Sequence, residues 1–226
     1  EYTELSFTGG PPAPVIAELS RRAGCEITYR GAVSRSDGRF VLSVVASGAD
    51  AEAIEGAART LEDPPEVRTV ATYDDACLLE IVPAGESIVR TVLDHNGSIR
   101  GLTADGDRVE LRIQVPRTAN PNTVVETVLD RYGGLSLAAQ RRRERDPNSR
   151  TELAESLRDE LTDRQLETVQ KAYLSDYFEW PRPVPGESIA DSMGITRSTF
   201  HQHLRAAQSK IMGALLEEIE PPPRPN

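Results

Sequence analysis

The sequence predicts an α+β fold in which tandem ferredoxin-like (βαββαβ) repeats are followed by an all-α helix-turn-helix domain. One observation is that strand and helix patterns occur in the same order twice within residues 1–145. A second is that turn glycines recur about 70 residues apart, since Gly24 corresponds to Gly97 and Gly38 to Gly106. A third is a short helix, a glycine turn and a long helix near the end of the chain.

The first expected repeat covers about residues 3–73. Apolar residues at helical spacing indicate two helices, the second of which ends before Pro64-Pro65. Ser36-Asp37-Gly38 lies between two strand-like runs and indicates a hairpin turn. The expected elements are a strand at 3–8, a helix at 14–22, strands at 25–35 and 39–47, a helix at 51–61 and a strand at 66–73.

The second expected repeat covers about residues 76–140. Val109, Leu111, Ile113 and Val115 alternate with polar residues, which indicates a strand with one covered face. A hairpin turn is expected at Asp105-Gly106. The expected elements are a strand at 76–82, a helix at 85–95, strands at 98–103 and 108–115, a helix at 122–132 and a strand at 135–140.

Residues 1–145 are expected to form one sensor or oligomerisation domain. Its fold hosts many unrelated functions and so selects none of them. Acylphosphatase-type chemistry is disfavoured, because Gly9-Gly10-Pro11-Pro12 after the first strand contains no arginine and two prolines without N–H donors. Binding of a small-molecule effector and plain dimerisation both stay open.

A linker follows this domain. The basic run at 141–145 is either a solvated strand end or an auxiliary phosphate contact, and Asp146-Pro147-Asn148-Ser149 marks a break. The C-terminal helix-turn-helix domain is expected at 151–220, with a Pro-rich tail at 221–226. It starts with a short helix from Thr151 to Asp159.

Thr162 is expected to cap the next helix, which an aromatic loop at 177–182 follows. The residues at core spacing in this helix are Leu166, Val169, Tyr173 and Leu174. In the loop, Phe178 and Trp180 are expected to pack this helix onto the next two. Stacking on nucleic-acid bases is the alternative for the loop aromatics.

The helix-turn-helix itself is expected from a short helix at 188–193 and a long helix that Thr196 caps and that runs to about 218. A small residue is needed where the helices cross, and Ala190 is there. Gly194 supplies the positive φ that the turn needs. The apolar residues that would lock the helices are Ile189, Met193, Ile195, Phe200 and Leu204. A generic helical hairpin is the alternative.

The charge of the long helix favours DNA binding. No acidic residue occurs from Ser192 to Leu216, although the 226 residues include 36 Asp and Glu. We expect Arg205 and Lys210 to contact phosphates, and the cap residue Thr196 can also donate to one. The residues expected to face base edges are Arg197, Ser198, His201 and Gln202. A solvated helix face that merely lacks acids is the alternative.

Composition limits the classes of function. The formal net charge is −10, and among the 26 cations only Lys171 and Lys210 are lysines. An acid-rich, lysine-poor surface is typical of proteins that work in concentrated salt, although a GC-rich genome would also favour arginine. No run approaches the roughly 18 apolar residues of a membrane span, and no signal-peptide pattern is present. We therefore expect a cytoplasmic protein without membrane contact.

Catalytic and metal chemistry have no clear carrier in the sequence. Cys25 and Cys77 are expected to be buried free thiols, with a redox pair as the alternative. The three histidines do not form a zinc pattern with two cysteines. No spacing places Ser, His and Asp as a triad, and no Gly-rich phosphate loop occurs. We expect no enzymatic activity, metal or cofactor.

Several blocks of the C-terminal domain carry a family resemblance. They are LTDRQ at 161–165, Tyr173, YFEWPR at 177–182, IADSMGI at 189–195 and STF at 198–200. Over residues 161 to about 215 the chain resembles the helix-turn-helix of the bacterio-opsin activator family of halophilic archaea, and the preceding doubled domain resembles, more weakly, the module associated with it.

The resemblance implies a transcriptional regulator but not control of bacterio-opsin, because the long family members carry upstream PAS and GAF sensor domains that are not found in this sequence. Two positions depart from the family: Phe200 stands where a β-branched residue is common, and His201-Gln202-His203 is an unusual recognition triplet.

The sequence therefore predicts a transcriptional regulator that binds double-stranded DNA. A homodimer is expected, because one helix-turn-helix is a small DNA contact that a two-fold axis would double. One rival is a ligand-binding regulatory protein whose C-terminal domain contacts the transcription machinery instead of DNA. The other rival is a small-molecule-binding enzyme on the N-terminal repeats.

Overall fold

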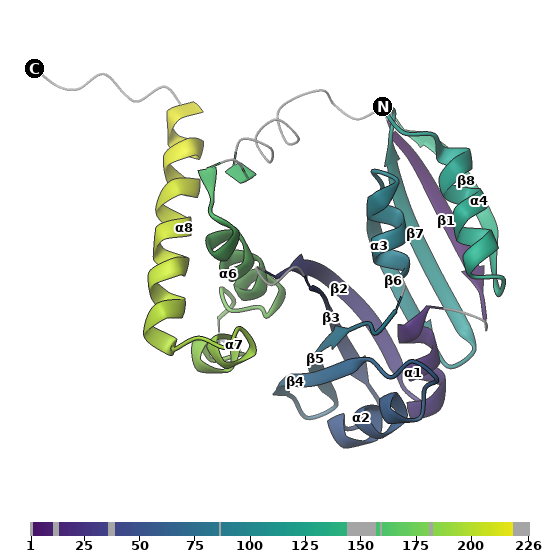
Figure 1. The fold of residues 1–226 in the computed structure, drawn as a ribbon, viewed down its shortest axis with the longest axis horizontal. Helices are drawn as coiled ribbons and strands as arrows, with labels where there is room; N and C mark the ends of the chain where they lie inside the picture. The colour runs from purple at the N-terminus through teal and green to yellow at the C-terminus, as the bar shows by residue number, and fades with distance from the viewer. Residues whose placement is uncertain are drawn as a thin grey trace, which may run out of the picture. The chain divides into compact units, whose positions relative to one another are not determined.

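A computed structural model of the chain describes residues 2–10, 14–35, 39–85, 87–143, 157–158, 160–180 and 183–218. The chain divides into two compact units (Figure 1). The first comprises Glu1–Ala32 and Phe40–Asp146, and the second comprises Val33–Arg39 and Pro147–Asn226. The expected turn at 36–38, the linker from 144 to 149, most of the short helix at 151–159 and the tail at 221–226 lie outside the described residues.

The first unit follows the predicted order of strands and helices, although Val33 and Ser34, the last two residues of one strand, are counted with the second unit. Its elements are β1 (Tyr2–Gly9), α1 (Val15–Ala23), β2 (Glu26–Ser34), β3 (Phe40–Ser47), α2 (Ala51–Arg59), β4 (Glu66–Thr72), β5 (Ala76–Val82), α3 (Ile88–Asp94), β6 (Ser98–Asp105), β7 (Arg108–Pro116), α4 (Pro121–Arg131) and β8 (Leu135–Arg143). Each predicted element is confirmed, with ends within three residues of those expected.

The strand order differs from the one that two contiguous repeats require. The strands form one sheet in the order β4-β5-β3-β2-β6-β7-β1-β8. Repeats confined to residues 3–73 and 76–140 would place β1 between β3 and β4, and β5 between β7 and β8. Instead, β1 pairs antiparallel with β7 and β8, and β5 pairs antiparallel with β3 and β4 (Figure 1). The prediction of contiguous repeats is therefore corrected: the two halves of the sheet exchange their first strands.

There is a simple physical reason why the sequence pattern did not reveal this exchange. Leu5 and Phe7 of β1 and Leu79 and Ile81 of β5 alternate in the same way and are all buried. Alternation determines which face of a strand enters the core, but it does not determine which neighbour the strand pairs with. Either strand satisfies the hydrophobic pattern of either half, so the pattern in the sequence could not distinguish the two arrangements.

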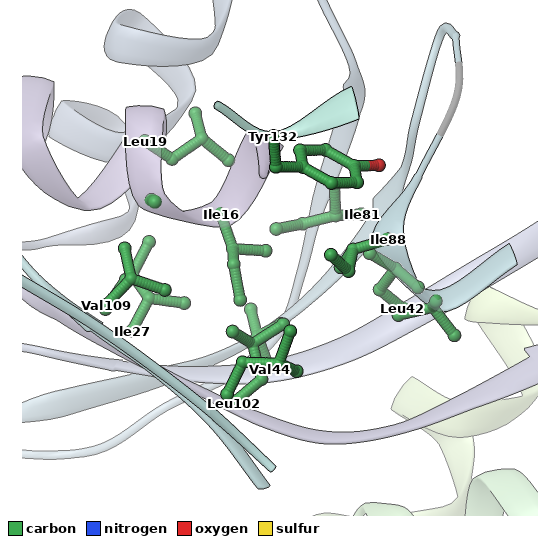
Figure 2. Close-up of a cluster of buried hydrophobic side chains, with 14 of the residues drawn as sticks. Ile16, Leu19, Ile27, Leu42, Val44, Ile81, Ile88, Leu102, Val109 and Tyr132 are labelled. Carbon is green, nitrogen blue, oxygen red and sulfur yellow. The ribbon is translucent and has the colours of Figure 1, made fainter. Parts of the chain in front are cut away.

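One hydrophobic core joins the two halves of the sheet. All four helices of the first unit contribute buried residues to it, together with one face of the sheet. Figure 2 shows the side chains of Ile16, Ile27, Val44 and Val109, from α1, β2, β3 and β7, in this cluster. On β7 the predicted alternation is confirmed, because the four apolar residues from Val109 to Val115 are fully buried.

The two cysteines lie in this core as free thiols. Burial raises the pKa of Cys25 from its ordinary value to about 11, and burial also raises the pKa of Cys77. Both thiols are therefore neutral near pH 7, which agrees with the expectation of buried free thiols and disfavours a reactive redox pair.

The second unit contains three described helices, α6 (Asp163–Leu174), α7 (Gly186–Ser192) and α8 (Arg197–Glu218). Contacts join all three pairs of helices, and those between α6 and α8 are the most extensive. Across the described parts of both units, no helix has the length and apolar character needed to span a bilayer.

Candidate nucleic-acid interface

The helix α6 begins where the sequence predicts. The hydroxyl of Thr162 accepts a hydrogen bond from the backbone N–H of Gln165 at 3.3 Å, and the backbone N–H of Thr162 donates to Gln165 Oε1 at 3.2 Å. This capping box satisfies two N–H groups that a helix N-terminus leaves unpaired. The predicted cap at Thr162 is confirmed.

The buried face of α6 is not the predicted one. Tyr173 is 72% exposed, and Leu166, Val169 and Leu174 are only half-buried. The side chains that α6 buries are Glu167, Thr168, Lys171 and Ala172. The prediction of an apolar core face on α6 was therefore wrong.

Hydrogen bonds allow this polar face to be buried. The Lys171 ammonium donates to the Ser192 hydroxyl at 3.1 Å, and that hydroxyl donates to the Ile189 carbonyl at 2.9 Å. Arg164 forms an ion pair with Glu167 at 3.2 Å. Buried polar groups are tolerated when they have partners, and the bond from Lys171 to Ser192 also connects α6 to the end of α7.

The helix α7 starts at Gly186, two residues before the predicted start. A side chain at Gly186 would be crowded by its neighbours, since a Cβ there would lie 3.2 Å from a ring carbon of Phe200 and 3.2 Å from a ring carbon of Tyr177, so these rings would have to shift slightly. The absence of a side chain lets the backbone of α7 pack directly on two aromatic rings. This close approach fixes where α7 crosses α8.

The turn between α7 and α8 has the predicted features. Gly194 adopts a left-handed conformation with φ of 66°. The Thr196 hydroxyl accepts a hydrogen bond from the backbone N–H of Thr199 at 3.1 Å, which confirms Thr196 as the cap of α8. The predicted locking residues Ile189, Met193, Phe200 and Leu204 are buried, together with Ala190 at the crossing, and Ile195 is half-buried.

The aromatic loop packs differently from the prediction. Trp180 is 91% exposed and Phe178 is 46% exposed, so they do not hold α6 onto the other helices as expected. Tyr177 has this role, because its ring is buried and meets the fully buried ring of Phe200 edge-on at 5.5 Å. Hydrophobic periodicity gives no means of choosing among the three aromatics of this loop, and the sequence prediction therefore named Phe178 and Trp180 instead of Tyr177.

The predicted base-facing residues are all exposed. Four residues of the predicted set lie along one groove of about 640 Å³, here called the α8 groove. It is lined by Tyr177, Phe178, Ser198, His201, Gln202, Leu204, Arg205 and Gln208. Ser198, Gln202 and Arg205 are separated by four and then three positions, so they lie on one side of the helix. None of these eight lining residues, all in the described part of the chain, is acidic.

The other predicted site residues lie outside the groove lining. Arg197 and Thr196 are exposed at the N-terminus of α8. Lys210 is engaged elsewhere: its ammonium donates to the Glu160 carbonyl at 2.6 Å and to Gln165 Oε1 at 3.0 Å. These bonds hold α8 against the start of α6. The structure therefore gives Lys210 partners within the fold, and its expected contact with a phosphate stays a prediction.

Sequence reasoning missed three groove residues. Gln208 continues the polar series by one more turn, a signal that the helical spacing contained. Tyr177 and Phe178 come from the loop and reach the groove through tertiary packing, which no local pattern reveals. Within the described residues, no three His, Cys, Asp or Glu side chains gather in an arrangement that would hold a metal ion.

Comparison with known proteins gives two family matches. Residues 1–155 match the family described as BAT, the GAF and HTH_10 associated domain. Residues 161–213 match the family described as HTH_10, an HTH DNA binding domain. The helices α6 and α7 and most of α8 lie within this second match.

The similar proteins come from halophilic archaea. A protein of Haloferax volcanii described as a transcriptional regulator is 34% identical over 222 residues, which are 97% of this chain and 38% of that protein. The bacterioopsin transcriptional activator of Halobacterium salinarum is 32% identical over 217 residues, 95% of this chain and 31% of that protein. The transcriptional regulator NarO of Haloferax volcanii is 36% identical over 124 residues, 54% of this chain and 58% of that protein.

This chain therefore spans well under half the length of the first two relatives. The predicted resemblance to the bacterio-opsin activator family is confirmed by the two domain matches and by these relatives. Because the first match covers more than half of the sequence, the chain belongs to the BAT family, and its C-terminal part belongs to the HTH_10 DNA-binding domains.

Proposed function

We propose that this protein is a transcriptional regulator that reads the major groove of double-stranded DNA with the exposed side of α8. The observation that carries the proposal is the α8 groove, where four of the predicted contact residues lie on one side of a helix held by a helix-turn-helix core. The absence of acids from Ser192 to Leu216 supports it, because a carboxylate facing DNA would repel the phosphates.

Each contact residue has a role that its chemistry suits. Gln202 can pair with adenine through two hydrogen bonds, and Ser198 and His201 can each bond to a base edge. Arg205 is suited to a phosphate oxygen, and Arg197 at the start of the helix to guanine. The Thr196 hydroxyl caps α8 and lies where it can also donate to a phosphate.

Binding to DNA sites selected from a random library, in concentrated potassium chloride, tests this proposal. We expect Gln202→Ala to lower the ratio of specific to scrambled affinity by about tenfold, within the 1–3 kcal/mol typical of a base contact. Arg205→Ala should weaken both sequences to a similar extent. Ser209→Ala, an exposed change on α8 outside the groove lining, is the control and should change neither.

The first unit is proposed to supply dimerisation. A single α8 groove gives a small DNA contact, and a two-fold dimer would double it and read a palindromic site. We propose that the unit consists of two ferredoxin-like halves with exchanged first strands, which the strand order supports. Light scattering in molar salt should give twice the monomer mass, and a monomer with and without DNA would contradict the dimer.

Effector binding has one supporting observation in the first unit. A cavity of about 380 Å³ lies where β1, β7 and β8 meet the start of α4. It is lined by Tyr2, Thr3, Pro116, Arg117, Ala119, Pro121 and Arg142. Two guanidinium groups favour a carboxylate or phosphate ligand. A thermal-shift screen of small anions on the wild type and on Arg142→Ala tests this role.

The competing function is contact between the C-terminal domain and the transcription machinery instead of DNA. Library selection separates the two functions, because a domain that contacts only protein enriches no DNA sequence. The family match of residues 161–213 to a DNA-binding domain favours DNA. We propose no enzymatic activity for this chain.

A further inference from the structure

The α8 groove is lined by aromatic residues of the loop as well as by mostly polar residues of α8. Tyr177 and Phe178 of the loop form what is here called the aromatic wall. An occupant of this groove therefore meets both hydrogen-bonding groups and an apolar ring. Hydrogen bonds from α8 alone would give the two aromatic residues of this wall no role in binding.

Phe178 is held in place although it is half-exposed. Its ring meets the Tyr177 ring edge-on, with centroids 5.6 Å apart and planes at 85°. Tyr177 is in turn fixed against Phe200, which is fully buried in the core. The ring of Phe178 is therefore oriented by buried neighbours, while 46% of the residue stays accessible to an occupant of the groove.

We propose that Phe178 is a specificity-determining residue that packs against the C5 methyl group of a thymine in the bound DNA. This inference rests on the proposed DNA-binding function. The thymine methyl is the apolar group that base edges present in the major groove, and phenylalanine is among the side chains that contact it. Gln202, which lines the same groove, would read a neighbouring base edge.

Concentrated salt favours a contact of this kind. The Debye length falls to about 3 Å at 1 M salt, so the attraction between arginines and phosphates contributes little. Apolar contacts are not screened, and salts that are excluded from protein surfaces strengthen them. For a chain of net charge −10 with haloarchaeal relatives, a fixed apolar ring offers recognition that persists in salt.

The experiment combines a protein change with a DNA change. A site is first selected by the full-length protein from a random library, and each thymine is then replaced by deoxyuridine, which lacks only the methyl group. With the wild type, we expect one thymine per half-site at which deoxyuridine weakens binding about fourfold, corresponding to about 0.8 kcal/mol for one buried methyl. With Phe178→Ala, thymine and deoxyuridine should bind equally at that position.

Two further variants make the result specific. Phe178→Leu keeps an apolar side chain and should retain part of the preference for thymine. This variant still tests the role of Phe178 if the alanine variant misfolds. Tyr173→Ala is the matched control, because this tyrosine is 72% exposed on the same unit but does not line the groove. It should preserve the full fourfold effect. The difference between thymine and deoxyuridine should persist from 0.5 to 3 M potassium chloride.

Other results would overturn the inference. A selected site at which no thymine methyl matters, or at which Phe178→Ala keeps the full methyl effect, shows that Phe178 does not read thymine. If Phe178→Ala abolishes capture of a protein partner while DNA binding is unchanged, the aromatic wall contacts protein. If the wild type enriches no sequence at all, the proposed function itself fails, and this outcome is distinct from the others.

Discussion

Replacing Lys210 by Met should destabilise the second unit and leave DNA recognition intact. The ammonium makes two hydrogen bonds, to the Glu160 carbonyl at 2.6 Å and to Gln165 Oε1 at 3.0 Å. Gln165 also belongs to the capping box of α6, so Lys210 holds a side chain that caps the start of this helix. Methionine keeps the apolar stem but removes the donor.

The magnitude follows from these two bonds. A hydrogen bond that involves a charged group contributes about 1.5–3 kcal/mol when it is buried. Lys210 is only half-buried, so water replaces part of the lost interaction, and a net loss of about 1 kcal/mol is expected. For a unit of this size such a loss lowers the unfolding midpoint by about 4–8 °C.

Thermal unfolding followed by far-ultraviolet circular dichroism measures the stability, and fluorescence anisotropy with the selected DNA measures the affinity. Ser209→Ala, at the exposed neighbouring position, is the control for both. The reasoning would be refuted by a Lys210→Met protein with unchanged stability and uniformly weaker binding to all DNA sequences. That result would restore Lys210 as a phosphate contact.

Three other predictions follow from the fold. Tyr177→Ala should lower the free energy of unfolding by about 3 kcal/mol, since its ring is buried, whereas Trp180→Ala should change it by less than about 0.5 kcal/mol, as thermal unfolding will show. The thiol of Cys25 has its pKa raised to about 11, so its contribution to stability is complete below the ordinary value of 9.0 and is lost as the pH rises towards 11. In urea unfolding, Cys25→Ala should therefore lower the free energy of unfolding by less at about pH 10.5 than at about pH 8. Ser6→Cys combined with Arg112→Cys should form an intramolecular disulfide, detected by mass spectrometry, because the two residues are opposite each other on β1 and β7; failure of the folded protein to form it would contradict this pairing.

Local patterns predicted what depends on neighbours in sequence. The caps at Thr162 and Thr196 and the left-handed turn at Gly194 were all predictable, because each depends on a few consecutive residues. Strand boundaries followed from alternation and turn glycines. Exposure of the predicted α8 residues, such as Gln202, also followed from helical spacing once the buried positions such as Phe200 were identified.

Tertiary choices escaped prediction for physical reasons. The partner strands of β1 could not be inferred, because β1 and β5 present equivalent apolar faces to the core. The buried face of α6 was missed because its polar residues gain partners that lie far away in sequence. Lys171 and Ser192 are an example, since they are 21 positions apart and meet only when α7 packs on α6.

The two lysines of the chain show how an arginine-rich protein uses each cation. All other cations are arginines, whose planar groups suit contacts with carboxylates and phosphates at a surface. Lys171 and Lys210 instead both donate inside the helix-turn-helix, to Ser192 and to Glu160 and Gln165. An ammonium is a compact donor on a long flexible stem, so it reaches a hydroxyl or carbonyl between two helices where a guanidinium would not fit as readily. Because both lysines already have partners within the fold, we expect the arginines and neutral side chains of α8 to make most of the proposed contacts with DNA, through short-range contacts that persist in concentrated salt.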